Sequence, residues 1–183
     1  ANKKFADKIP WHLVHFFWTD ERCVPPESDQ SNFGNCQRFL LNYLTIPNKN
    51  IHRIRGEEDP TTESYRYARE VQGHMVLRKN ENTLFDWVFL GVGLDGHTAS
   101  LFPGHDLSNS SRLCEVAQHP ETGQNRVTMT PSAINNSDRI TYHVIGGTKA
   151  EIVGRLASSL PTNNIYPALQ IQGEWFLDKE SAS

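Results

Sequence analysis

Short, continuously apolar segments that alternate with longer amphipathic ones constrain the fold of this chain most strongly. The clearest are residues 13–18, 85–91 and 140–145, and each is followed by glycine or by polar residues. A strand that is apolar on both sides is typical of a parallel sheet whose two faces are covered. Spacing and capping residues predict the covering helices, at residues 32–44, 60–78 and 149–157. The sequence therefore predicts an α/β domain with a mainly parallel sheet.

Weaker patterns complete this prediction. Further strands are expected at residues 51–54, 113–117, 126–129 and 175–177, and a single helical turn at residues 131–134. Ser31, Asp59 and Thr148 are the predicted helix caps, and Asp178 is expected to start a terminal helix.

The composition excludes several classes of function. With 183 residues, 37% of them hydrophobic, the chain is long enough to bury a core. A net charge of −3 gives no general attraction to nucleic acid or to an anionic membrane, so neither is an expected partner. No apolar run approaches the roughly 18 residues of a membrane-spanning helix, and no signal-peptide pattern is found. Three cysteines without a CxxC pair favour a reduced, cytoplasmic protein, and we expect no metal site.

Polar residues follow the ends of the three clearest strands. They are Asp20 and Arg22 after the first, Asp95 and His97 after the second, and Lys149 after the third. Ligands of parallel α/β sheets bind beyond the carboxyl ends of the strands. Converging cations at such ends, with Arg126 at a further strand boundary, are typical of a phosphate site.

The glycine-rich turn at residues 91–96 has two interpretations. Its GxGxxG pattern matches a dinucleotide fingerprint. However, Pro103 leaves little room for the helix that should follow Gly96, and Asp95 would repel a pyrophosphate. In the interpretation that we favour, the turn is a catalytic elbow in which Asp95 orients His97 as a general base.

Four segments, in this order along the chain, carry a family resemblance. They are WTDERCVP at residues 18–25 with Ser31 and Asn32, GVGLDGHTASLFPG at residues 91–104, NRVTMT at residues 125–130, and GGTKA at residues 146–150. They closely resemble the signatures of the 6-phosphogluconolactonases. The resemblance runs from about Trp11 to the end of the sequence.

This resemblance implies a fold and an activity. The implied fold is shared with glucosamine-6-phosphate deaminases and ribose-5-phosphate isomerases: a three-layer α/β/α domain with a modified Rossmann-like sheet. The implied activity is hydrolysis of 6-phosphoglucono-δ-lactone to 6-phosphogluconate in the oxidative pentose phosphate pathway. It requires no cofactor, and the expected partner is a small phosphosugar lactone.

The resemblance also implies roles for individual residues. His97 would be the general base, and Asp95 would orient His97 or bind sugar hydroxyls. The substrate and its phosphate would be held by Arg22, Lys149, Arg126, Asp20 and Asn32, with Gly93 and Gly96 supplying backbone donors for the oxyanion.

Two alternatives have the same fold. Glucosamine-6-phosphate deaminases carry an acidic residue five places after the histidine, where this chain has Phe102. A non-catalytic sugar-phosphate sensor would not need His97, and no DNA-binding motif accompanies the domain. Both alternatives are therefore weaker than the lactonase.

One departure from the family pattern concerns the N-terminal side. Members of the family have a strand, a phosphate-binding loop and a helix before the segment that begins at Trp11. We expect residues 1–183 to form a single 6-phosphogluconolactonase-like domain that is N-terminally incomplete.

Overall fold

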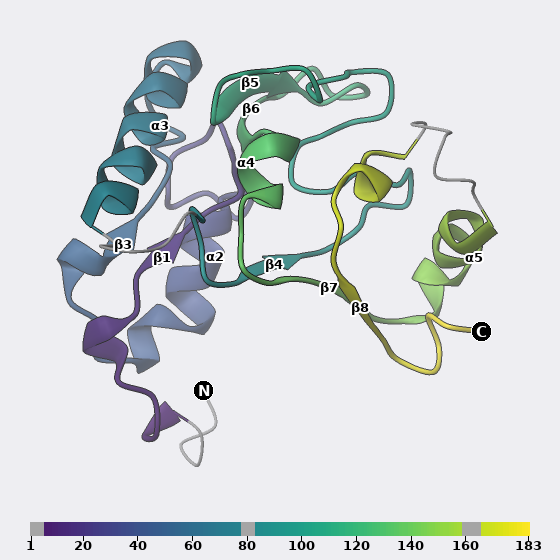
Figure 1. Cartoon of the computed structure of the whole chain (residues 1–183), viewed down its shortest axis with the longest axis horizontal. Helices are drawn as coiled ribbons and strands as arrows, with labels where there is room; N and C mark the ends of the chain where they lie inside the picture. Colours follow the sequence, from purple (N-terminus) through teal and green to yellow (C-terminus); the bar gives the residue numbers. More distant parts are fainter. Residues whose placement is uncertain (1–5, 78–82, 159–165) are drawn as a thin grey trace.

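The chain combines two parallel sheets, one antiparallel sheet and four α-helices in the part described by the computed structural model, residues 6–77, 83–158 and 166–183 (Figure 1). The α-helices are α2 (Asn32–Phe39), α3 (Pro60–Leu77), α4 (Pro131–Asn135) and α5 (Ala150–Ser158). Short 3-10 helices occupy Trp11–Leu13, Leu41–Tyr43, Asn48–Asn50, Gly147–Lys149 and Pro167–Gln170.

The strands expected from their apolar character pair in parallel. β1 (Phe16–Phe17) pairs with β3 (Ile51–His52). β4 (Val88–Leu90), β7 (Ile140–Val144) and β8 (Glu174–Leu177) form a second parallel sheet in the order β4-β7-β8. The α/β prediction is confirmed, and β1, β3, β4 and β7 are shorter than the apolar runs that indicated them.

A third sheet is antiparallel and corrects the expectation of a mainly parallel sheet. It contains β2 (Asp20–Arg22), β6 (Asn125–Met129) and β5 (Cys114–Gln118), in the order β2-β6-β5. β2 was not predicted because its sequence is Asp-Glu-Arg, which carries no apolar pattern. The described chain is thus a mixed α/β structure, and the candidate site residues Asp20, Arg22 and Arg126 lie on its antiparallel sheet.

Two of the predicted helix caps are confirmed. The Ser31 side chain accepts a hydrogen bond from the Gly34 N–H at the start of α2. Asp59 accepts one from the Thr62 N–H, at 2.8 Å, at the start of α3. Each cap satisfies a backbone donor that has no partner within its helix.

Other predicted boundaries were wrong. Thr148 lies inside a 3-10 turn that precedes α5 and does not cap it. Asp178 accepts the Ser181 N–H at 2.8 Å in a turn, where a helix was expected. The helix predicted over residues 32–44 ends at Phe39 and gives way to a 3-10 turn. The break after Phe39 is not visible in the hydrophobic spacing, because apolar residues three apart also fit a short 3-10 turn.

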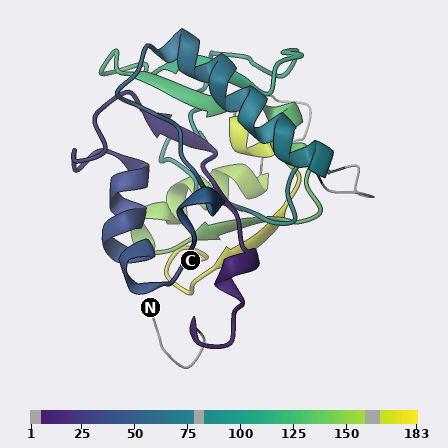
Figure 2. The same cartoon turned by 90° about the vertical axis from the view of Figure 1, so that its left-hand side faces the viewer.

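The core lies between the sheets and the helices. Figure 2 shows α3 lying across the green strands β5 and β6, on which it packs. The Tyr67 side chain of α3 is fully buried, and its hydroxyl donates to the Trp18 carbonyl at 2.9 Å, just after β1. This contact connects α3 to the segment that leads from β1 into the candidate site.

One face of the sheet β4-β7-β8 carries exposed aromatic rings. Trp87 and Phe89 stack with centroids 4.5 Å apart, and Phe89 lies 5.5 Å from His143. His143 stacks in turn on Phe176, at 5.3 Å. We call these four residues the aromatic row.

None of the helices in the described ranges is long and apolar enough to cross a membrane.

Candidate active site

The turn after β4 brings Asp95 and His97 together. The Gly93 N–H donates to the His97 carbonyl at 2.8 Å, which closes the turn. A Cβ atom on Gly93 would lie 2.1 Å from His97 Nδ1, so only glycine fits there. Gly96 has φ of +83°, and a Cβ there would lie 2.4 Å from the ring of Tyr166. Both glycines are therefore required by the geometry of the Asp95–His97 pair and its support.

A short hydrogen bond orients the imidazole of His97. Its Nδ1 lies 2.5 Å from Asp95 Oδ1, and the His97 backbone N–H donates to the same oxygen at 3.2 Å. Burial raises the pKa of Asp95, but the hydrogen bonds and charge of His97 outweigh it, so this pKa lies below its usual value. An ionised Asp95 holds the Nδ1 proton and leaves Nε2 as the basic nitrogen.

The dinucleotide interpretation of residues 91–96 fails in the structure. No helix follows Gly96: residues 97–104 form turns and an isolated bridge between Thr98 and Leu101. A dinucleotide fingerprint requires a helix N-terminus at this point to hold the pyrophosphate.

The segment after His97 is fixed to the antiparallel sheet. Ser100 Oγ donates to Asp20 Oδ2 of β2 at 2.7 Å. The Ser100 N–H donates to Thr128 Oγ1 of β6 at 3.2 Å. Ser100 is completely buried, so these two bonds set the position of the His97 turn relative to β2 and β6.

Asp20 also connects this segment to α2 and to Arg126. The Asn32 side-chain amide donates to the Asp20 carbonyl at 3.0 Å and to its Oδ1 at 3.2 Å. Arg126 lies 4.0 Å from Asp20 Oδ2. Asp20 therefore contacts two other predicted site residues, Asn32 and Arg126.

Asn32 is positioned by a buried carboxylate, that of Glu21. Glu21 accepts the backbone N–H groups of Asn32 and Phe33, each at 2.7 Å, and the Ser31 hydroxyl at 3.0 Å. Burial raises the pKa of Glu21 above its usual value, although these hydrogen bonds lower it. Glu21 is 1% exposed and holds the N-terminus of α2 against β2.

Two arginines face each other across the antiparallel pair. Arg22 of β2 and Arg126 of β6 are direct partners in the register. Burial, followed by the charge of Arg22, lowers the pKa of Arg126. Arg22 donates to the Gln30 carbonyl at 2.6 Å, but its Nε is buried without a hydrogen-bond partner. Like charges opposed in this way destabilise a sheet, and an unpaired buried donor costs more, so the pair is suited to an anion.

Phe102 connects the His97 turn to this arginine pair. Its buried ring lies 5.0 Å from the ring of His97, and the Arg126 guanidinium carbon lies 6.0 Å from its centroid. His119 approaches the same ring edge-on at 5.1 Å. The position that carries an acid in the deaminases thus holds an apolar ring against the candidate base.

Lys149 reaches the same turn from the third strand end. Its Nζ donates to the Val92 carbonyl at 2.6 Å, one residue before Gly93. The 3-10 turn Gly147–Lys149 places this cation at the beginning of α5.

The predicted site residues thus form one connected set. The turn after β4 contains Gly93, Asp95, Gly96 and His97, and Lys149 contacts it. Ser100 and Phe102 connect this turn to the predicted site residues on the antiparallel sheet and α2. These are Asp20, Arg22, Asn32 and Arg126.

Sequence reasoning assigned no role to Ser100 or Phe102 in the geometry of the site. Ser100 lies in the quoted signature, but its partner Asp20 is 80 residues away in the sequence. No spacing rule connects residues at that separation.

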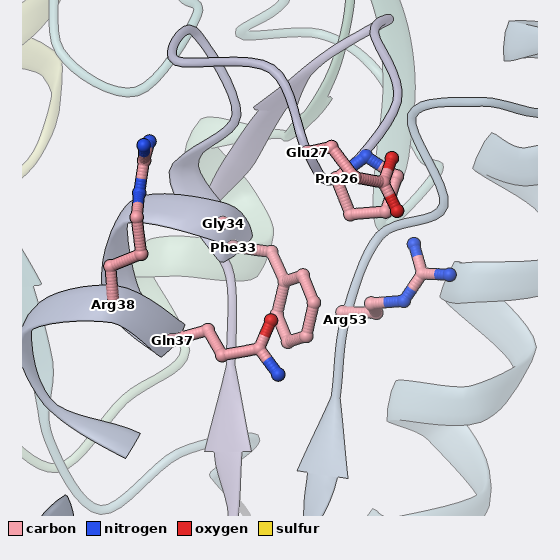
Figure 3. Close-up of a pocket in the computed structure, with 7 residues that line it drawn as sticks. All are labelled: Pro26, Glu27, Phe33, Gly34, Gln37, Arg38 and Arg53. Atoms are coloured by element: carbon pink, nitrogen blue, oxygen red, sulfur yellow. The ribbon is translucent and has the colours of Figure 1, made fainter. Parts of the chain in front are cut away.

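A separate surface hollow of about 220 Å³ lies beside α2. Figure 3 shows the Phe33 ring at its centre, between Gln37 and Arg53. Its two arginines are paired with carboxylates: Arg38 with Asp29 at 2.6 Å and Arg53 with Glu57 at 2.5 Å. None of the predicted catalytic or phosphate-binding residues lines this hollow.

Comparison with known proteins identifies the family. The model of the family described as glucosamine-6-phosphate isomerases/6-phosphogluconolactonase matches residues 1–177. A 6-phosphogluconolactonase of Haemophilus influenzae is 41% identical over 184 residues, covering 98% of this chain and 77% of the relative.

Two solved structures share the fold. The crystal structure of devB protein has a TM-score of 0.92 at 41% identity, covering 99% of this chain and 78% of that one. The 6-phosphogluconolactonase of Thermotoga maritima has a TM-score of 0.81 at 32% identity, covering 97% and 78% respectively. The chain therefore belongs to the glucosamine-6-phosphate isomerase/6-phosphogluconolactonase family.

Proposed function

We propose that this protein is a 6-phosphogluconolactonase, which hydrolyses 6-phosphoglucono-δ-lactone to 6-phosphogluconate in the pentose phosphate pathway. One observation carries the proposal: the imidazole of His97, held at Nδ1 by Asp95, lies in a turn that also contacts Lys149 and leads to the arginine pair. A base beside a cluster of cations suits a substrate with a reactive carbonyl and a phosphate. The relatives named above support the same activity.

In the proposed mechanism, His97 activates water. Nε2 accepts a proton from a water molecule whose oxygen attacks the lactone carbonyl carbon. The Gly93 and Gly96 N–H groups, which the sequence suggested as oxyanion donors, instead donate to the His97 carbonyl at 2.8 Å and to the Gly93 carbonyl at 3.0 Å. The oxyanion would be stabilised by a cation that reaches this turn, such as Lys149. When the tetrahedral intermediate collapses, the bond to the ring oxygen breaks and that oxygen receives the proton from Nε2. One water is consumed and the base is regenerated, so no cofactor takes part.

The cations would hold the phosphate. Arg22 and Arg126 form the proposed anion site on the antiparallel sheet, and Lys149 approaches from the start of α5. Asp20 and Asn32 act indirectly, since Asp20 lies beside Arg126 and Asn32 holds Asp20. Asp95 acts by orienting His97.

The proposal also covers the layer arrangement of the fold and the location of the protein in the cell. We infer a three-layer arrangement in which the parallel strands belong to one Rossmann-like sheet, and a cytoplasmic location.

A hydrolysis assay tests the function. Freshly generated 6-phosphogluconolactone is offered to the purified protein, and acid release is compared with spontaneous hydrolysis. We expect a rate that saturates with substrate and that His97→Asn abolishes. Ammonia release from glucosamine 6-phosphate at a higher kcat/KM would favour the deaminase. Saturable sugar-phosphate binding without turnover of either substrate would favour the sensor.

A further inference from the structure

Three imidazoles from distant parts of the chain meet beside the first parallel strand pair. His15 immediately precedes β1, His52 is the second residue of β3, and His74 lies in the last turn of α3. One ring nitrogen of each lies within 4.8 Å of the corresponding nitrogens of the other two. Among the described residues this is the only such group of three or more metal-ligating side chains. We call these three residues the histidine cluster.

The rings are packed closely enough to share one ligand. His15 Nδ1 lies 2.9 Å from His52 Nε2, and the two rings stack with an interplanar angle of 5°. His74 approaches His52 edge-on, with ring centroids 4.1 Å apart, and lies 5.2 Å from His15. A hydrogen bond between His15 and His52 explains why these two rings lie close together. It does not explain why the ring of His74 also lies beside them.

A carboxylate sets the tautomer of the central histidine. Glu70 Oε1 lies 2.7 Å from His52 Nδ1, so His52 donates through Nδ1 and its Nε2 keeps a lone pair. Glu70 also pairs with Arg66. The hydrogen bond from His52, aided by Arg66, holds the pKa of Glu70 at about 2 against the opposing effect of burial. A carboxylate–histidine pair of this kind is the usual support of a metal-bound imidazole.

We propose that His15, His52 and His74 bind a single Zn²⁺ ion, with a water molecule as the fourth ligand. Three imidazole nitrogens suit Zn²⁺, which prefers four ligands in a tetrahedral arrangement. His52 is buried, His74 is half-buried and His15 is exposed, so the ion has a route from solvent and an open position. The sequence predicted no metal site because its three cysteines include no CxxC pair. The positions of His15, His52 and His74, far apart in the chain, gave no ligand spacing to set against that prediction.

The proposed ion would have a structural role as a cross-link. It would connect the start of β1, the end of β3 and the last turn of α3, three elements that Figure 1 shows together on one side of the molecule. The Phe17 ring stacks on His52 at 4.3 Å and closes the inner side of the histidine cluster. No residue of the cluster belongs to the candidate active site, so the proposal is independent of the proposed function.

Metal titration of the purified full chain tests this proposal. The chain is first stripped with a chelator and then titrated with Zn²⁺, and with Co²⁺ to follow its visible absorption. We expect one equivalent to bind and Co²⁺ to give the intense bands of four-coordinate geometry. At free Zn²⁺ about 100 times the Kd, Tm should rise by roughly 5–10 °C.

Matched variants locate the ion. His15→Asn changes an exposed ligand and is expected to fold normally, yet to lose the Tm rise and the four-coordinate spectrum. Glu70→Gln should weaken binding about 10- to 100-fold, the usual effect of removing the partner of a metal-bound histidine. His12→Asn, an exposed histidine three residues earlier, should bind as the unaltered chain does.

An activity control and variants of two other histidines show which results would contradict the zinc proposal. Lactonase kcat/KM should be unchanged in His15→Asn, because His15 lies outside the active site. Zn²⁺ binding that survives in both His15→Asn and His74→Asn would overturn the proposal. So would binding that is lost in His97→Asn but kept in His15→Asn, since the ion would then lie at the Asp95–His97 pair.

Discussion

At the scale of single residues, the proposed catalysis depends on the Asp95–His97 pair, which is held by a glycine turn. Asp95 fixes Nδ1 of His97, which leaves Nε2 as the base. His97→Asn should lower kcat/KM by about 10²- to 10⁴-fold, the usual effect of losing a general base. Steady-state kinetics measure the loss, and an unchanged Tm shows that the fold is intact. Near-normal kcat in a folded His97→Asn protein would mean that another group activates the water.

The opposed arginines lead to a second prediction at this scale. Arg22→Ala removes one of two like charges facing each other, together with the Nε that has no partner. A charge-assisted hydrogen bond is worth roughly 1.5–3 kcal/mol, so kcat/KM should fall by about 10- to 150-fold, and likewise for Lys149→Ala.

Two controls separate phosphate binding from a structural role. Hydrolysis of gluconolactone, which lacks the phosphate, should change little in either variant. Inorganic phosphate should raise the Tm of the unaltered chain more than that of Arg22→Ala. Equal losses on both lactones would show that Arg22 and Lys149 support the fold and do not bind phosphate.

At the scale of elements, α3 is joined to β3 through Glu70. The hydrogen bond from His52, with the Arg66 pair, lowers the Glu70 pKa to about 2 from 4.5. A carboxylate with a lowered folded-state pKa stabilises the fold above its unfolded pKa, and this stabilisation is lost as pH falls through the folded value. As pH falls from about 5 to about 2, the free energy of unfolding of the unaltered chain should therefore decrease. Glu70→Gln has no carboxylate at this position, so its free energy of unfolding should not include this decrease.

Denaturant unfolding at several pH values, with chelator present, measures this loss. The chain should exceed Glu70→Gln in free energy of unfolding at pH 6, and the difference should shrink steadily toward pH 2. A difference that stays constant over this range would mean that the Glu70 charge does not contribute through His52 and Arg66.

Some of the secondary-structure elements could be predicted from the sequence and others could not. Apolar runs located the parallel strands, and side-chain caps located the starts of α2 and α3, because burial and capping act over a few residues. The charged strand β2 gave no such signal, so its antiparallel pairing with β6 was not foreseen. The Ser100–Asp20 contact and the histidine cluster were also missed, because they depend on pairings between distant segments.

At the scale of the whole molecule, the aromatic row leads to a prediction about association in solution. Trp87, Phe89 and Phe176 are 45%, 57% and 46% exposed, respectively. With His143 they form a nearly continuous aromatic strip across β4, β7 and β8. Contiguous apolar surface of this kind promotes association, whereas single exposed apolar side chains do not.

We therefore predict that residues 1–183 self-associate as concentration rises and that Phe89→Ser with Phe176→Ser reduces this association. Sedimentation velocity over a concentration series measures the effect. Phe39→Ser is the matched control, because Phe39 is 74% exposed on α2 and lies outside the aromatic row. It should leave association unchanged, since what brings molecules together is the continuity of the strip and not the exposure of any one ring. Equal effects of the control and the double variant would show that association does not proceed through this face of the sheet.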